Sequence, residues 1–126
     1  MSNIRYNEAE EAYELPFQLW DNLQTVRFYT EDENAIMENI QVIARKLDEL
    51  DKAKEHISGL LIDDGYYEGG DPLALAKILQ MKTVYVDIDD EEIIVCFEVT
   101  TSDGYMQGIA HGELYAGIFE ITGWVE

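Results

Sequence analysis

The sequence has very little positive charge. It contains eight lysine and arginine residues against 27 aspartates and glutamates, which gives a formal net charge of −19. A field of that sign repels phosphate backbones and anionic lipid surfaces, and it speeds encounters with basic proteins. We therefore expect no direct nucleic-acid binding and no membrane binding. Acidity also keeps a protein in solution, so a steering role and plain solubility are both open explanations.

Basic residues are missing altogether from the C-terminal third. No lysine or arginine follows Lys82, whereas ten acids do: Asp87, Asp89, Asp90, Glu91, Glu92, Glu98, Asp103, Glu113, Glu120 and Glu126. A stretch of one sign over this length favours a functional acidic surface.

Cysteine is almost absent. Cys96 is the only one, so no internal disulfide can form, and its place in the apolar run 93–97 predicts a small buried side chain. No apolar signal region follows Met1, and no stretch approaches the roughly 18 apolar residues of a membrane span. A reducing cytoplasm is the expected location.

Recognisable catalytic motifs are also lacking. No serine lies in a Gly-x-Ser-x-Gly turn, and the glycines of residues 65–70 have neither the spacing nor the basic partner of a phosphate-binding loop. His111 and Glu113 offer two metal ligands where a zinc site needs three or four. We therefore predict that the protein is not an enzyme and carries no cofactor.

Calcium is the chemical alternative. Carboxylates alternate at Asp87, Asp89 and Glu91, and others cluster in the glycine-rich segment 63–72. Oxygen ligands on a loop suit calcium, but neither segment fits the twelve-residue helix-loop-helix pattern. A calcium-binding or small-ligand module therefore stays as the second hypothesis.

Core-forming residues are plentiful, because 47% of the chain is hydrophobic. Together with a length of 126 residues this predicts one folded domain, residues 1–126. Apolar residues alternate from Tyr13 to Leu19 around Pro16, which indicates an edge strand or an extended segment. Residues 25–30 have the composition of a short strand.

A helical stripe begins after Thr30, where Thr30 and Glu33 have the spacing of a capping box. Apolar residues then recur at helical spacing to Leu61, over a length of about 50 Å if unbroken, so we expect a break near Asp51 or Gly59. Gly65 suits the C-terminus of this helical region. The pair Asp71-Pro72 suits the start of a short helix that runs to about Gln80.

Alternation predicts four strands in the remainder, over 82–88, 93–100, 105–111 and 113–122. Turns fall at the acidic segment 89–92, at 102–104 and around Gly112. The predicted fold is α+β, with a helical N-terminal half packed on a C-terminal antiparallel four-stranded meander.

Two acidic segments are candidate partner-binding surfaces. The loop 63–72 combines carboxylates with two adjacent tyrosines, a residue type enriched at interfaces. The predicted binding residues are Asp63, Asp64, Tyr66, Tyr67, Glu68 and Asp71, followed by the turn residues Asp89, Asp90, Glu91 and Glu92. The plain alternatives are a tyrosine that caps the core and an acidic turn that keeps a hairpin from pairing with its neighbours. The small residues between Gly108 and Gly117 are a third candidate.

A small acidic α+β domain without a catalytic motif resembles the bacterial immunity proteins that neutralise toxins. The end of the chain, residues 118–124, is also similar to small bacterial domains found near such toxins. The resemblance is one of layout and assigns no residue a role. It implies a protein-binding inhibitor whose partner has a basic surface, as many toxin nucleases do. A small-ligand or calcium-binding module, or an adapter protein, is the alternative.

Overall fold

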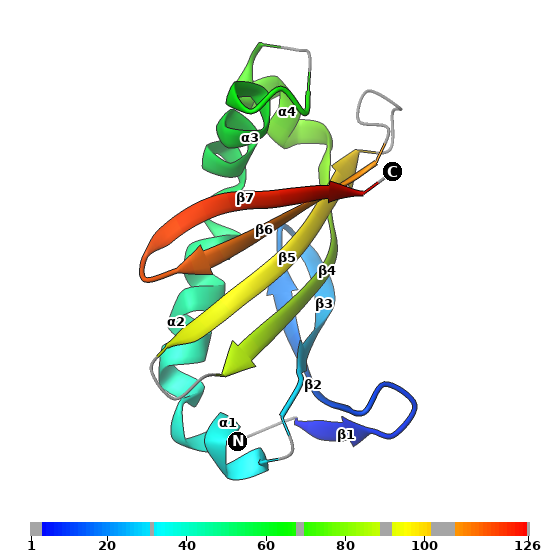
Figure 1. Ribbon diagram of the computed structural model, residues 1–126, viewed down its shortest axis with the longest axis vertical. Coiled ribbons are helices and arrows are strands. Elements are labelled where there is room, and N and C mark those ends of the chain that lie inside the picture. The colour runs from blue at the N-terminus through cyan, green and yellow to red at the C-terminus, as the bar shows by residue number, and fades with distance from the viewer. Residues whose placement is uncertain (1–3, 31, 68–69, 89–91, 102–107, 126) are drawn as a thin grey trace.

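The strands form one sheet that curls around the helices (Figure 1). The computed structural model describes residues 4–30, 32–67, 70–88, 92–101 and 108–125. Within them the sheet has seven strands in sequence order: β1 (Arg5–Asn7), β2 (Ala12–Leu19), β3 (Asn22–Phe28), β4 (Leu79–Ile88), β5 (Ile93–Thr101), β6 (Ile109–Tyr115) and β7 (Ile118–Val125). All neighbouring strands are antiparallel except β3 and β4, which are parallel.

The helices all lie between β3 and β4. They are α1 (Glu33–Glu38), α2 (Ile40–Asp51), α3 (Lys54–Asp63) and α4 (Pro72–Ile78). Parallel neighbours need a long crossover connection, and this helical segment supplies it. No helix in the described part of the chain is long and apolar enough to cross a membrane. The α+β class is therefore confirmed, and β4–β7 form the expected antiparallel meander inside a larger mixed sheet.

The prediction of a helical N-terminal half is wrong, because three strands precede the first helix. The two-residue turn between β2 and β3 consists of Trp20 and Asp21, with φ values of 52° and 65°. Residues other than glycine seldom adopt positive φ, and this turn has a tryptophan and no glycine at its two central positions. The sequence correctly predicted extended structure on both sides of the turn. Its composition did not indicate that the two segments form a hairpin.

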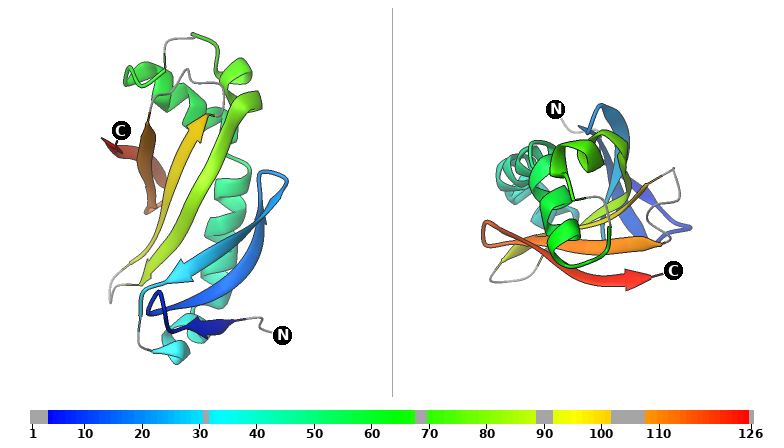
Figure 2. Two further views of the ribbon diagram at one scale, coloured as in Figure 1. Left: turned by 90° about the vertical axis from the view of Figure 1, so that its right-hand side faces the viewer. Right: turned by 90° about the horizontal axis from the view of Figure 1, so that it is seen from above.

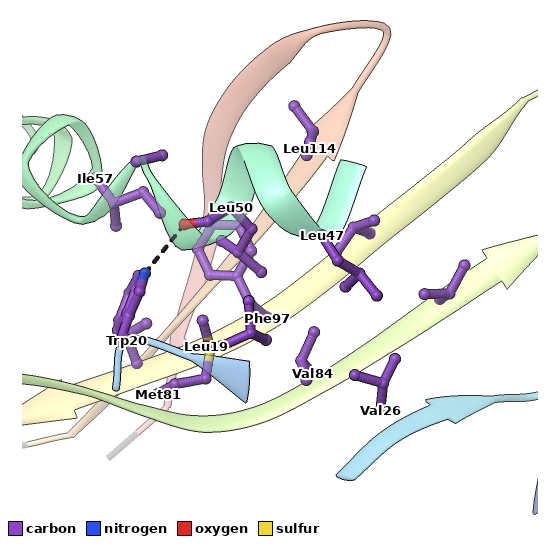
Figure 3. Packing of buried hydrophobic residues seen from close by; sticks show 14 of the residues in the cluster. Leu19, Trp20, Val26, Leu47, Leu50, Ile57, Met81, Val84, Phe97 and Leu114 are labelled. Atoms are coloured by element: carbon purple, nitrogen blue, oxygen red, sulfur yellow. Dashed lines mark hydrogen bonds between the residues drawn. The ribbon is translucent and has the colours of Figure 1, made fainter. Parts of the chain in front are cut away.

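The core fills the space between α2, α3 and one face of the sheet. The helical stripe supplies fully buried residues such as Ile43, Leu47 and Leu50, which confirms the periodicity. The strands supply Val84, Phe97 and other side chains from alternate positions (Figure 3). Both ends of the sheet contact the helices, β2 against α2 and β7 against α3, and Figure 2 shows the resulting curl.

Two helix boundaries differ from expectation. Asp32 caps α1 by accepting from the backbone N–H of Asn34 at 2.9 Å, so the predicted capping box of Thr30 and Glu33 is wrong. An additional break lies at Asn39, whose side-chain amide donates to the carbonyl of Ala35 at 2.8 Å. That bond offers the backbone an alternative to continuing the helix.

The remaining helix boundaries follow the prediction. The break near Asp51 is confirmed, because α2 ends there and α3 starts at Lys54. Gly65 follows α3 with φ 82°, and the N–H of Tyr66 returns to the carbonyl of Leu61 at 2.9 Å. This is the glycine-terminated helix end that the sequence predicted. Asp71 caps α4 by accepting from the N–H of Leu73 at 3.0 Å.

The last hairpin is displaced from its predicted position. Its turn lies at Ala116 and Gly117, with φ values of 50° and 81°, and not at Gly112. Gly112 lies inside β6, where an added Cβ would be 2.5 Å from Cζ of Phe97. The glycine therefore provides the space that the buried Phe97 ring occupies, and it does not form a turn.

Trp20 joins the first hairpin to the helices. Its backbone N–H donates to Oδ1 of Asp51 at 2.7 Å, and its Nε1 donates to the carbonyl of Leu50 at 3.0 Å (Figure 3). Nζ of Lys54 lies 5.5 Å from the centre of the ring. The carbonyl of Leu50 also accepts from the N–H of Ala53 at 3.1 Å, so the indole provides its second hydrogen bond where the chain bends from α2 into α3.

We expect Trp20→Phe to lower the free energy of unfolding by about 1–3 kcal/mol, because it removes the indole hydrogen bond and leaves unfilled volume. Urea denaturation measures the change. The control is Leu23→Ala in the same hairpin, whose side chain is 74% exposed and should change stability by less than about 0.5 kcal/mol. Equal stability of Trp20→Phe and the native protein would show that the indole does not hold this joint.

We expect Gly112→Ala to cost about 1–3 kcal/mol, because the new methyl group overlaps the fully packed Phe97 ring. Gly123→Ala on the neighbouring strand is the matched control, since nothing lies within 4 Å of its added Cβ. Thermal unfolding of both variants gives the comparison. Similar melting temperatures for the two would contradict a packing role for Gly112.

Candidate functional site on the open face of the sheet

One face of the sheet packs on the helices, and no helix of the described chain covers the other. In Figure 1, α2 lies behind the central strands, so the open face is toward the viewer. The strand register places one row of side chains across this face, from β2 to β7: Glu14, Arg27, Tyr85, Cys96, Glu113 and Glu120. The row contains most of the polar chemistry of the sheet.

The β2 end of the row is a closed ionic cluster. Glu14 is only 5% exposed, and its carboxylate lies 3.3 Å from Nε of Arg27 and 3.7 Å from Nε of Arg5. The side-chain amide of Asn7 donates to the same carboxylate at 3.1 Å. A buried charge that has these partners is satisfied internally. This cluster ties β1 to β3 and offers little to a ligand.

The centre of the row is a weakly acidic pair. Tyr85 and Cys96 lie directly opposite each other in the β4–β5 register. Burial, followed by the neighbouring Cys96, raises the pKa of Tyr85 to about 12. Burial also raises the pKa of the Cys96 thiol, which therefore stays protonated at neutral pH. Cys96 is half-buried on the open face and not in the helix-facing core where its apolar run suggested.

Beside this pair lies a carboxylate–imidazole contact that sequence reasoning missed. Oε2 of Glu98 is 3.1 Å from Nε2 of His111, and the hydroxyl of Thr83 donates to Oε1 of the same carboxylate. The three residues line a hollow of about 140 Å³ together with Arg27, Tyr29, Val84 and Tyr85. The sequence suggested Glu113 as the neighbour of His111, but the β5–β6 register brings Glu98 opposite it.

The β7 end of the row differs, because its charges are not paired. We call the four residues Glu113, Tyr115, Ile118 and Glu120 the hairpin patch. They line a hollow of about 240 Å³ on β6 and β7. Tyr115 is 49% exposed and Ile118 is 68% exposed. Sequence reasoning missed this patch because it put the hairpin turn at Gly112, whereas a turn at Ala116-Gly117 places all four on one face.

The loop predicted to bind a partner has two kinds of side chain. Asp63, Asp64 and Asp71 are exposed, in keeping with a contact surface. Tyr66 is half-buried and stacks on Trp124 of β7, with ring centres 5.1 Å apart and an interplanar angle of 15°. Tyr67 is also half-buried against the core. The tyrosines therefore hold the loop against the sheet. Glu68 lies outside the described residues.

The second predicted surface is only partly described. Glu92 is half-buried and lies 3.6 Å from Nζ of Lys46 on α2. Asp89, Asp90 and Glu91 lie outside the described residues. Glu92 adjoins the end of β4 opposite to the one that follows α4, so it is separated from the N-terminus of α4 by the length of the strand. The structure therefore does not bring Glu92 and Asp71 together.

Ligand-binding features elsewhere are limited. The described residues contain no group of three or more histidine, cysteine, aspartate or glutamate side chains that could hold a metal ion. Asp89 and Glu91 of the suggested calcium segment are not among them. A groove of about 510 Å³ runs between α3 and α4 and is lined by Lys52, Glu55, His56, Gly59, Leu60, Asp63 and Pro72. Its charges are of both signs.

Comparison with known proteins shows no relationship. The chain matches no protein-family model, no curated protein and no solved structure. The candidate site is therefore defined by its own geometry alone.

We expect Glu120→Lys to raise the free energy of unfolding by about 0.2–1 kcal/mol, because it replaces a like-charged cross-strand pair with an opposite one. Denaturant unfolding at low salt measures the difference, which should shrink as salt is added. Glu10→Lys, at an exposed glutamate in the turn between β1 and β2, makes the same change in net charge and is the control for general charge reduction. An equal gain in both variants would show that net charge, and not the pair, is responsible.

Proposed function

We propose that the protein is an acidic protein-binding inhibitor that covers a basic surface of its partner. The observation that carries the proposal is the open sheet face, where exposed apolar side chains adjoin carboxylates without ionic partners in a chain of net charge −19. Charge steers the encounter, while desolvated aromatic and aliphatic side chains provide the lasting contact. A toxin is the proposed partner and a basic nuclease is one such toxin, which makes the protein an immunity protein.

The exposed carboxylates of the loop 63–72 fit this proposal as steering charges. Asp63, Asp64 and Asp71 are exposed and lie where α3 ends and α4 begins. Figure 1 shows these two helices at the same end of the molecule. Exposed ion pairs contribute only about 0–1 kcal/mol each, so these residues act mainly on the association rate. Tyr66 and Tyr67 are half-buried against the protein itself, and truncating them would lower stability as well as contact area.

The proposal also holds that inhibition is stoichiometric and that the chain has no catalytic activity of its own. The protonated thiol of Cys96 is a poor nucleophile. The imidazole of His111 lies 3.1 Å from the carboxylate of Glu98, and the hydroxyl of Thr83 donates to that same carboxylate. A lone thiol suits a reducing cytoplasm, which is the proposed location.

Capture of the partner from the native host, followed by kinetics at varied salt, tests this function. We expect a basic protein that binds in one-to-one ratio. Its association rate constant should fall by about tenfold or more between roughly 20 and 300 mM NaCl, while dissociation changes much less. An association rate that is independent of salt, or the absence of any protein partner, would contradict the proposal.

Thermal unfolding separates this function from calcium binding. A ligand that binds only the native state stabilises it by RT ln(1 + [L]/Kd), so a specific ion raises the melting temperature in a saturable way. We expect calcium and magnesium to give the same small rise by screening the net charge. A saturable rise with calcium alone would favour the metal-binding function instead.

A further inference from the structure

We propose that the hairpin patch is the receptor site for an arginine side chain of the partner protein. This inference rests on the proposed function and goes further, because it names the contact surface and the chemical group that the surface takes. The surface is the unpartnered sheet face at β6 and β7, and the argument for its occupant is charge complementarity.

No basic side chain in the described part of the chain neutralises the hairpin patch. The register sets Glu113 directly opposite Glu120, and cross-strand neighbours have Cβ atoms about 4.5–5.5 Å apart. The sequence contains no lysine or arginine after Lys82. Among the described residues neither glutamate has an ion-pair partner, whereas Glu14 on the same face lies against two arginines. Two like charges in this position destabilise a hairpin unless a cation joins them.

The apolar part of the hairpin patch selects the kind of cation. Tyr115 and Ile118 are themselves directly opposite each other, next to the two glutamates. The ring of Tyr115 can contact the face of a guanidinium, and Ile118 can pack on its aliphatic stem. A planar guanidinium presents donors along two edges and so suits two separate carboxylates better than the compact ammonium of lysine.

The hairpin patch lies on paired strands whose opposite face packs in the core. Its side chains are therefore held in place before a ligand binds. The side chains between the patch residues point the other way, into the core: Leu114 is fully buried, and the Phe119 ring lies 6.4 Å from that of Phe97. Both glutamates therefore project from paired strands and not from a loop. A site on such elements loses little freedom when a ligand binds.

A titration with two peptides tests the inference before any partner is known. The probe is acetyl-Gly-Arg-Gly-amide, and its control is the same peptide with citrulline, which has the shape of arginine without its charge. We expect saturable NMR shifts of the backbone amides of β6 and β7 with the arginine peptide, in the millimolar range of Kd at low salt. The citrulline peptide should give none.

A pair of double variants locates the site. Glu113→Gln with Glu120→Gln should weaken the arginine peptide by about tenfold or abolish its shifts. Glu38→Gln with Glu49→Gln makes the same change in net charge at exposed glutamates of α1 and α2, and should bind as the native protein does. The spectra themselves show whether each variant is folded.

Three results would overturn the inference: no shifts with the arginine peptide, shifts spread evenly over all acidic surfaces, or equal weakening by the two double variants. A dimer in sedimentation that Ile118→Asp dissociates would assign the face to a second copy of the chain and would likewise overturn it. The outcomes are separable from those of the proposed function. A captured basic partner whose affinity is unchanged by the patch variant keeps the function and removes this site.

Discussion

The fold depends on the insertion of Trp20 into the bend between α2 and α3. The indole and the backbone of this one residue contact both Leu50 and Asp51, at the end of α2. They hold the first hairpin against the helices, and the hairpin in turn places β3 beside β4 as the only parallel pair in the described sheet. The whole helical segment is the crossover between those two strands. The joint acts together with the β3–β4 pairing and with the buried Val26 and Phe28, which also attach the first hairpin to the rest of the fold.

Because all the helices occupy one side of the sheet, the other side must be stable in water. Most of its charged groups meet that condition by pairing within the face, as Glu14 does with arginine and Glu98 does with His111. The pairs lie at the β2 end and the centre, where the basic residues of the sheet are. Toward β7 the basic residues end, and Glu113 and Glu120 are left opposite each other. This asymmetry is the basis of the proposed arginine site.

Prediction of the site from the sequence was limited by register. The acidity of the C-terminal third and the alternation in β5 were visible in the sequence, and the loop carboxylates Asp63, Asp64 and Asp71 are exposed as expected. The cross-strand partners were not visible, because a side chain's neighbour on a sheet depends on where each turn falls. A turn at Ala116-Gly117 in place of Gly112 moved every residue of β7 to a different partner. It also made Glu113 and Glu120 direct cross-strand neighbours.

The sequence by itself determined several local features: the helical stripe, its break near Asp51, the helix boundaries at glycine and proline, and the absence of basic residues from the C-terminal third. These features are local, because they depend on spacing and backbone preference within a few residues. Only the tertiary structure decided that the chain begins with strands and that β3 and β4 run parallel. The tertiary structure also decided which of the described glutamates lack an ion-pair partner. Those outcomes depend on the turns at Trp20-Asp21 and Ala116-Gly117, where Trp20 and Ala116 adopt positive φ values that the local sequence did not indicate.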